Sequence, residues 1–178
     1  MGICLIEGGA AAAGGGKGKI EVLGFIDVTN AAARGLQVLI NENNNDLSRF
    51  YFQTNGKEAI LAENININDY TFLAIEATAA GIHPYAYLQV YFNDTTSTNN
   101  KLGNLGFATL KNWEDGRDDS NNVTTGQSRY SYFFSPERYN KKGLDTGNII
   151  VKSNYQSGDT QFYLKNITLY GIKGEIEE

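Results

Sequence analysis

The segment from Tyr85 to Phe92 constrains the fold of this chain most strongly, because apolar and polar side chains alternate along it at every second residue. Successive side chains of a β-strand point to opposite faces of the sheet, so this period of two predicts a strand with one buried face. The apolar face comprises Ala86, Leu88, Val90 and Phe92, and the other face comprises Tyr85, Tyr87, Gln89 and Tyr91. Such a strand needs a second apolar layer against which to pack.

Short apolar segments of this kind recur along the rest of the chain, separated by Asn, Asp and Gly. The 20 Gly residues, against 2 Pro, provide many turns together with the abundant Asn, and helical periodicity is scarce. Strands are predicted at residues 19–26, 35–41, 48–54, 58–63, 70–79, 85–93, 104–110, 129–135, 147–154 and 160–171. One turn of helix is expected at 28–34 and a long loop at 112–127. The spacing predicts an all-β fold, a two-sheet antiparallel sandwich of the jelly-roll type, with residues 19–178 as one domain.

Residues 1–18 are different in character. A short apolar run, MGICLI, is followed by a low-complexity Gly/Ala-rich stretch at residues 8–18 that cannot build a core. We interpret it as an extended N-terminal arm. It is expected either to pack on its own domain or to dock on protein subunits of a larger assembly.

The polar face of the strand at 85–93 is the first candidate binding surface. Aromatic rings stack on the apolar face of a sugar ring, and amide or guanidinium groups pair with its hydroxyls. The segment at 48–54 has a similar pattern, with Phe50 and Phe52 inward, and the two strands could lie side by side. The candidate ligand-binding residues are Tyr85, Tyr87, Gln89, Tyr91, Arg49, Tyr51, Gln53 and Trp113. The alternative is purely structural, because tyrosines also stabilise solvent-facing sheets without a ligand.

Two further residues have more than one interpretation. Trp113 lies in a polar, turn-rich stretch, where its ring could clamp a ligand or cap the end of the sandwich. His83, the single histidine, precedes Pro84 at a strand entry and is interpreted as a turn residue.

Charge and cysteine content exclude several classes of partner. A net charge of −5, with no cluster of Lys and Arg, argues against nucleic acid. Cys4 is the single cysteine, so no disulfide within the chain can form, and one Cys with one His cannot supply an ordinary zinc site.

No apolar run approaches the ~20 residues of a membrane span, and no signal peptide is evident at the N-terminus.

Catalysis is not predicted. A serine nucleophile would need His83 as its base, and no Gly-x-Ser-x-Gly motif is present. A glycosidase would need two paired carboxylates, of which Glu76 is one candidate, although it is more simply a residue of a solvated strand face. No cofactor is expected. The Asx-rich stretches 41–46 and 115–122 contain calcium-type oxygen ligands without the EF-hand spacing; we interpret them as turns, with a structural calcium site as the alternative.

Two stretches resemble jelly-roll carbohydrate-binding modules. Residues 158–171, GDTQFYLKNITLYG, resemble the strand that closes those sandwiches, and residues 68–77, NDYTFLAIEA, resemble a strand that follows a turn in the same families. The resemblance implies a non-catalytic sandwich that binds a glycan on an aromatic sheet face or in its end loops. The scarcity of Trp departs from the flat aromatic platforms of cellulose-binding modules.

The start of the chain resembles that of small virion proteins of tailed bacteriophages, in which a short strand and a Gly/Ala arm precede a β-domain. This resemblance implies an arm docked on the particle and a location on a virion or an extracellular surface. Together the observations predict a non-catalytic jelly-roll module that binds glycans and is attached to a larger assembly. The alternative is a structural capsid or tail decoration subunit with no sugar ligand.

Overall fold

The protein is described by a computed structural model of the whole chain. The described residues are 18–43, 48–53, 56–79, 87–106, 128–133, 143–154 and 163–174, with Ala79, Gly106 and residues 128–133 described as backbone only. They form ten β-strands: β1 Lys19–Asp27, β2 Gln37–Leu39, β3 Arg49–Tyr51, β4 Glu58–Asn66, β5 Phe72–Ala79, β6 Tyr87–Phe92, β7 Lys101–Gly106, β8 Ser128–Phe133, β9 Thr146–Ser153 and β10 Tyr163–Lys173. Three single turns of 3-10 helix are η1 Ala32–Arg34, η3 Ile67–Asp69 and η4 Thr98–Asn100.

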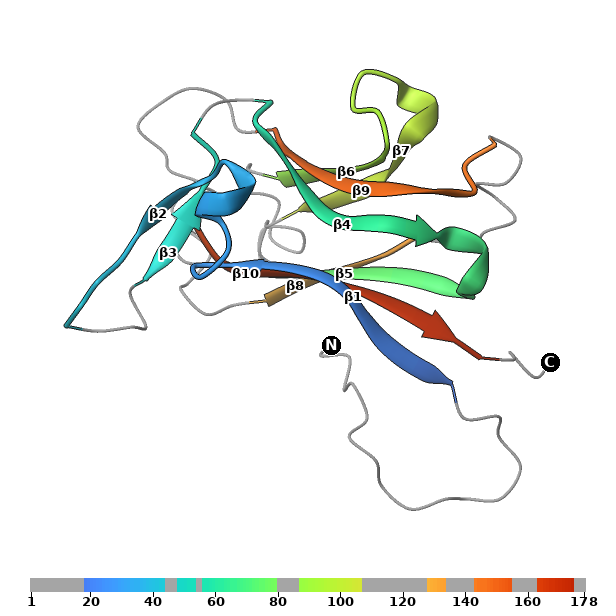
Figure 1. Cartoon of the computed structure of the whole chain (residues 1–178), viewed down its shortest axis with the longest axis horizontal. Helices are drawn as coiled ribbons and strands as arrows, with labels where there is room; N and C mark the ends of the chain where they lie inside the picture. Colours follow the sequence, from blue (N-terminus) through green and yellow to red (C-terminus); the bar gives the residue numbers. More distant parts are fainter. Residues whose placement is uncertain are drawn as a thin grey trace, which may run out of the picture.

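The strands form two antiparallel sheets that face each other (Figure 1). Sheet A has six strands in the order β2-β3-β10-β5-β8, with β1 also paired to β10, and sheet B has four in the order β4-β9-β6-β7. The chain changes sheet after β3, β4, β5, β7, β8 and β9. The late strands β9 and β10 insert between earlier ones, β9 between β4 and β6 and β10 between β3 and β5. This strand order is that of a jelly roll, as the sequence predicted.

The core lies between the sheets and is built from the inward residues of each strand. On β6 these are Leu88, Val90 and Phe92, which are at most 1% exposed, as the alternation predicted. On β3 the inward residue is Phe50, and Phe52 follows it into the core. The other large, fully buried side chains are Ile26, Leu61, Ile67 and Ile75. Burial of this apolar surface is the main favourable term in the stability of the sandwich.

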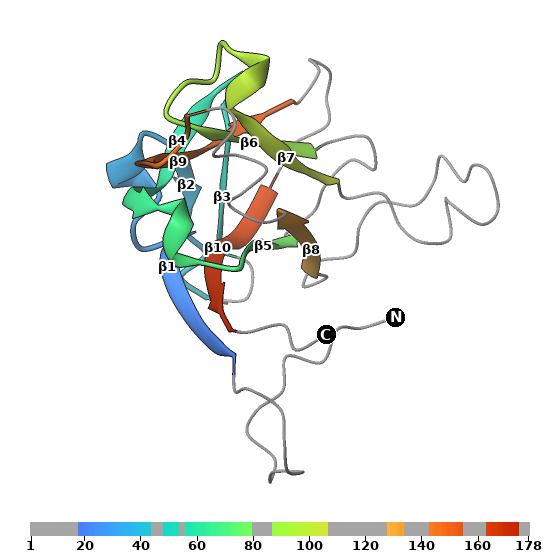
Figure 2. The same ribbon diagram turned by 90° about the vertical axis from the view of Figure 1, so that its right-hand side faces the viewer.

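The two sheets approach each other closely where β1 passes β4. A register shift between Val22 and Gly24 interrupts the pairing of β1 with β10, and Leu23 there packs against the core. A Cβ atom added at Gly24 would lie 2.1 Å from the carbonyl oxygen of Leu61 on β4. Only glycine permits this approach, which brings β1 against sheet B (Figure 2).

The predicted strands all correspond to observed strands, with shifts at their ends. The prediction of a helical turn at 28–34 is confirmed by η1, which ends at Gly35 with a φ of 76°. Residues 1–17, most of the predicted arm, and the predicted loop at 112–127 lie outside the described residues. Within the described residues no helix is long and apolar enough to cross a bilayer.

Candidate functional site

The outer face of sheet B holds a row of polar side chains that crosses all four strands. Gln89 on β6 lies opposite Lys152 on β9 and opposite Asn104 on β7, and Lys152 lies opposite Glu58 on β4. Glu58 and Asn104 are exposed, and Gln89 and Lys152 are half-buried. Neighbouring strands are about 4.8 Å apart, so the row is roughly 14 Å long. We call these four residues the polar row.

Two tyrosines flank the polar row on β6. Tyr87 and Tyr91 are two residues to either side of Gln89 and therefore share its face. Tyr87 is half-buried and lies opposite Gly106, which has no side chain to cover the phenol ring from β7. The arrangement places an aromatic ring beside a run of hydrogen-bonding groups.

Tyr91 is less accessible than expected. It is 7% exposed, and the ammonium group of Lys152 lies over its ring, 6.0 Å from the centroid. Burial raises the pKa of the Tyr91 hydroxyl, and the charge of Tyr87 raises it further. Tyr91 therefore has little ring surface left on which a ligand could stack, and its hydroxyl stays protonated well into the alkaline range.

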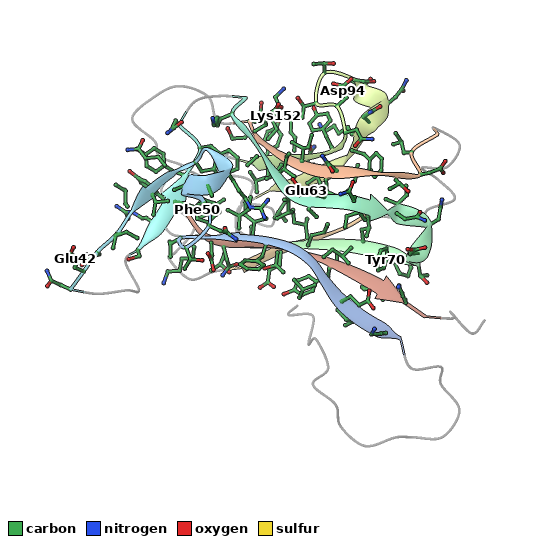
Figure 3. The ribbon with its side chains drawn as sticks, in the orientation of Figure 1. Glu42, Phe50, Glu63, Tyr70, Asp94 and Lys152 are labelled. Carbon is green, nitrogen blue, oxygen red and sulfur yellow. The ribbon has the colours of Figure 1, made fainter. Side chains whose placement is uncertain are left out.

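The loop after β6 borders the polar row at its Glu58 end. Asp94 accepts hydrogen bonds from the backbone N–H of Thr96 at 2.8 Å and from its hydroxyl at 2.7 Å. These bonds lower the pKa of the Asp94 carboxyl, and Lys152 lowers it further. Thr95 donates its hydroxyl to the Glu58 carboxylate at 2.5 Å, which connects the loop to β4. Asp94 and Lys152 both lie on the sheet B side of the molecule (Figure 3).

The chemistry of this face is therefore a carboxylate, an ammonium group and two amides in one line, with a tyrosine beside them. Carboxylates accept hydrogen bonds, ammonium groups donate them, and amides do both. A ligand rich in hydroxyl groups offers both donors and acceptors and matches such a row. The aromatic ring supplies apolar contact area next to it.

The predicted residues on the second strand lie elsewhere, which corrects the expectation that the two strands are neighbours. Arg49 and Tyr51 are on β3, which belongs to sheet A and pairs with β2 and β10. Tyr87 and Gln89 are on β6 in sheet B. The polar faces of the two strands point away from the core on opposite sides of the sandwich, so they cannot form one site.

Arg49 and Tyr51 instead form a cluster with Tyr163, a residue that the sequence did not single out. Tyr51 lies directly opposite Tyr163 on β10. Their rings meet edge to face at 5.1 Å and 75°, and the Arg49 guanidinium lies 4.1 Å from the centroid of the Tyr163 ring. Tyr163 could not be recognised from the sequence, because the pairing of β3 with β10 joins residues more than a hundred positions apart.

The remaining predicted residues do not join either group. Gln53 is exposed and lies beyond the end of β3. Tyr85 and Trp113 lie outside the described residues, so their proposed contacts with a ligand stay predictions.

Glu76, the candidate catalytic carboxylate, lies on the outer face of sheet A. It is opposite Thr168 on β10 and accepts a hydrogen bond from the Tyr170 hydroxyl at 2.9 Å. It is therefore far from the polar row, on the other side of the sandwich.

No three or more His, Cys, Asp or Glu side chains come together as metal ligands in the described part of the chain. Of the two Asx-rich stretches, 115–122 lies outside the described residues. At the start of 41–46, Asn43 donates its backbone N–H to the Asn41 side chain at 3.1 Å, which is a turn motif.

The sequence did not single out three members of the polar row, Glu58, Asn104 and Lys152. A signal for Lys152 exists in the alternation of β9, where Ile149, Val151 and Ser153 point inward. That alternation places Lys152 on an outer face, but it does not say which strand lies beside it. The row exists only because β9 lies between β4 and β6.

Comparisons with known proteins found distant structural likenesses. No family model and no curated protein matches the sequence. A structure from a study of binding sub-sites in a family 6 carbohydrate-binding module has a TM-score of 0.45 and 15% identity, covering 85% of this chain and 93% of the other. CsCBM6-3 from Clostridium stercorarium, solved with cellobiose, has a TM-score of 0.44 and 13% identity, with coverages of 79% and 82%. A family 6 carbohydrate-binding module from Clostridium cellulolyticum, solved with xylose, has a TM-score of 0.47 and 13% identity, with coverages of 84% and 95%. We assign the jelly roll to this chain on its own strand order.

Proposed function

We propose that this protein is a non-catalytic glycan-binding module whose binding surface is the outer face of sheet B. The observation that supports this most directly is the position of Gln89 between Lys152 and Asn104, with Tyr87 on the same face. Tyr87 stacks on a sugar ring, and the polar row pairs with hydroxyls of that ring and its neighbours. At roughly 14 Å the row is long enough to contact more than one ring.

Binding without bond cleavage suits this surface. A glycosidase holds two carboxyl groups on two sides of one glycosidic bond, about 5–10 Å apart. On sheet B the four side chains of the polar row extend from one face of the strands, and Glu58 is exposed and bonded to Thr95. A ligand on such a surface is approached from one side, which favours recognition over chemistry.

A glycan array tests the proposal. The intact protein should bind at least one class of polysaccharide, and Tyr87→Ala should weaken that binding by about tenfold or more, because the stacking contact and its buried area are lost. Gln89→Ala should weaken it as well. Tyr51→Ala on sheet A is the matched control and should bind neutral polysaccharides as the wild type does. Binding of no polysaccharide, or equal binding by Tyr87→Ala, would reject this site.

We further propose that the module is carried on a larger assembly, such as a phage virion, by residues 1–18. The composition of that segment supports this, since an apolar hexapeptide on a Gly/Ala tether suits docking at a distance from the domain. A variant lacking residues 1–17 should keep the thermal unfolding midpoint of the domain and no longer co-purify with particles. Retention on the particles would contradict the tethering role.

A purely structural role, with a second copy of this chain as the partner, is favoured by a different observation. On the outer side of β1, Ile20, Val22 and Phe25 are 47%, 60% and 47% exposed. In the described part of the chain β1 pairs with β10 alone. An exposed apolar edge strand promotes association between copies. Sedimentation velocity of the wild type against Val22→Lys should show loss of a dimer, whereas a monomeric wild type would argue against this role.

A further inference from the structure

The Arg49 guanidinium is held in a defined place on the outer face of sheet A. Its carbon lies 4.1 Å from the centroid of the Tyr163 ring, and the Tyr51 ring supports Tyr163 edge-on at 5.1 Å. Tyr163 is 8% exposed, so its ring is a fixed platform. Below them, Phe50 is fully buried and anchors β3 to the core. We call Arg49, Tyr51 and Tyr163 the arginine cluster.

The charge of Arg49 has no counter-ion among the described residues. The two ion pairs found there both belong to Glu21, with Lys19 at 2.6 Å and Lys173 at 3.5 Å. The contact with the Tyr163 ring uses no acidic partner, and a guanidinium carries five N–H donors. Arg49 is half-buried, so its donors are in part accessible to a ligand.

A planar guanidinium with no counter-ion among the described residues is suited to a carboxylate, which it binds with two parallel hydrogen bonds. One polar group that can pair with hydroxyls lies on the same face, since Gln37 on β2 is opposite Tyr51 and is exposed. We propose that the arginine cluster binds an acidic sugar, with Arg49 pairing with the carboxylate of a uronic acid and Tyr51 contacting its ring. This site is separate from the polar row and does not depend on it.

The net charge of the chain limits the kind of ligand. With a net charge of −5 the protein repels a densely charged polyanion at long range. The attraction to Arg49 acts only at short range, and one guanidinium pairs with one carboxylate group of the ligand. An acidic peptide also has carboxylates. The tyrosine rings and the Gln37 amide on this strand face favour a sugar, whose hydroxyls and apolar ring face both find partners there.

Isothermal titration of the full chain with three probes tests the proposal: tetragalacturonate, its fully methyl-esterified form and an acetylated tetraglutamate peptide. Tetragalacturonate should bind, and esterification should weaken binding roughly 10- to 100-fold, because the charge-assisted pair is lost. Arg49→Gln should have the same effect as esterification. Arg49→Lys should recover only part of the affinity, since an ammonium group lacks the planar fork.

Two controls separate this site from the one on sheet B. Tyr87→Ala should leave tetragalacturonate binding unchanged, whereas it weakens the glycan found on the array, so either proposal can fail alone. Circular dichroism of each Arg49 variant checks that the fold is retained, and the methyl ester tests the same contact on the unaltered protein.

Four outcomes would each overturn the proposal. The wild type could bind no tetragalacturonate, or could bind the methyl ester or the peptide as tightly as tetragalacturonate. Arg49→Gln could also bind tetragalacturonate as tightly as the wild type does.

Discussion

The Tyr170 hydroxyl on β10 donates a hydrogen bond to the Glu76 carboxylate on β5 at a distance of 2.9 Å. Both residues are half-buried on the outer face of sheet A. Ala74, which lies opposite Tyr170 on the same face, is buried. The bond joins the two central strands of this sheet through their side chains as well as their backbones. It gives Glu76 a structural role that the sequence pattern alone did not indicate.

Replacing Tyr170 with Phe should therefore destabilise the fold. The change removes a hydrogen bond to a charged group, and because the pair is partly exposed we expect a loss of about 1 kcal/mol. Urea unfolding would measure it. Tyr51→Phe is the control, since the Tyr51 ring packs on Tyr163 without a hydroxyl bond to any described residue. Equal stability of Tyr170→Phe and wild type would mean that water replaces the bond without loss.

Ionisation of buried tyrosines should lower the free energy of unfolding of this protein in alkali. Burial raises the pKa of Tyr70, Tyr91 and Tyr170, and the carboxylates of Glu21 and Glu76 raise the values for Tyr70 and Tyr170 further. In the unfolded chain these groups ionise near pH 10. Stability is therefore unaffected at neutral pH and falls as the pH rises through about 10, because the unfolded state loses these protons first.

Ultraviolet absorbance of the phenolate, recorded together with circular dichroism, would follow this transition. Some tyrosines should ionise normally and others only when the fold is lost. Simultaneous ionisation of all tyrosines near pH 10, with the fold intact, would contradict the expected shifts.

Substitution of Gly24 by Ala should be among the most damaging single-methyl changes. The new Cβ atom would lie 2.1 Å from the Leu61 carbonyl oxygen and 2.8 Å from the Cβ of Ala62, so β1 must move away from sheet B. Overpacking of this kind typically costs about 1–3 kcal/mol. Gly18→Ala is the matched control, since the nearest atom to its Cβ is 3.3 Å away. Thermal denaturation of both variants would compare them, and equal midpoints would contradict the close approach of the sheets.

Substitutions at two neighbouring residues of β6 should have different effects, one on the stability of the fold and the other on glycan binding. Leu88 is fully buried, so Leu88→Ala should lower the free energy of unfolding by about 2–5 kcal/mol. Gln89 is on the outer face, so Gln89→Ala should change stability by at most about 0.5 kcal/mol while weakening glycan binding. Urea unfolding and the array would be read together. A large stability loss in Gln89→Ala would mean that the polar row is a structural network.

The local pattern was sufficient to predict the approximate position of each strand, and for two strands it also predicted the inward residues. At β6 the alternation placed Leu88, Val90 and Phe92 in the core, and at β3 it placed Phe50 there. This succeeds because the direction of a side chain from a strand depends only on its place in the period of two. The alternation predicted that Tyr91 is exposed, but Tyr91 is buried. The local pattern could not show this, because Lys152, which lies over the Tyr91 ring, comes from another strand.

By itself, the sequence determined the fold class, because short alternating segments separated by turn residues can bury their apolar faces only in packed sheets. Only the tertiary structure decided which strands are neighbours. It placed β6 beside β9 and β3 beside β10, so one expected surface became two, the polar row and the arginine cluster. The physical reason is that strand pairing uses backbone groups common to all residues. The choice of partner therefore depends on how the whole chain closes its core.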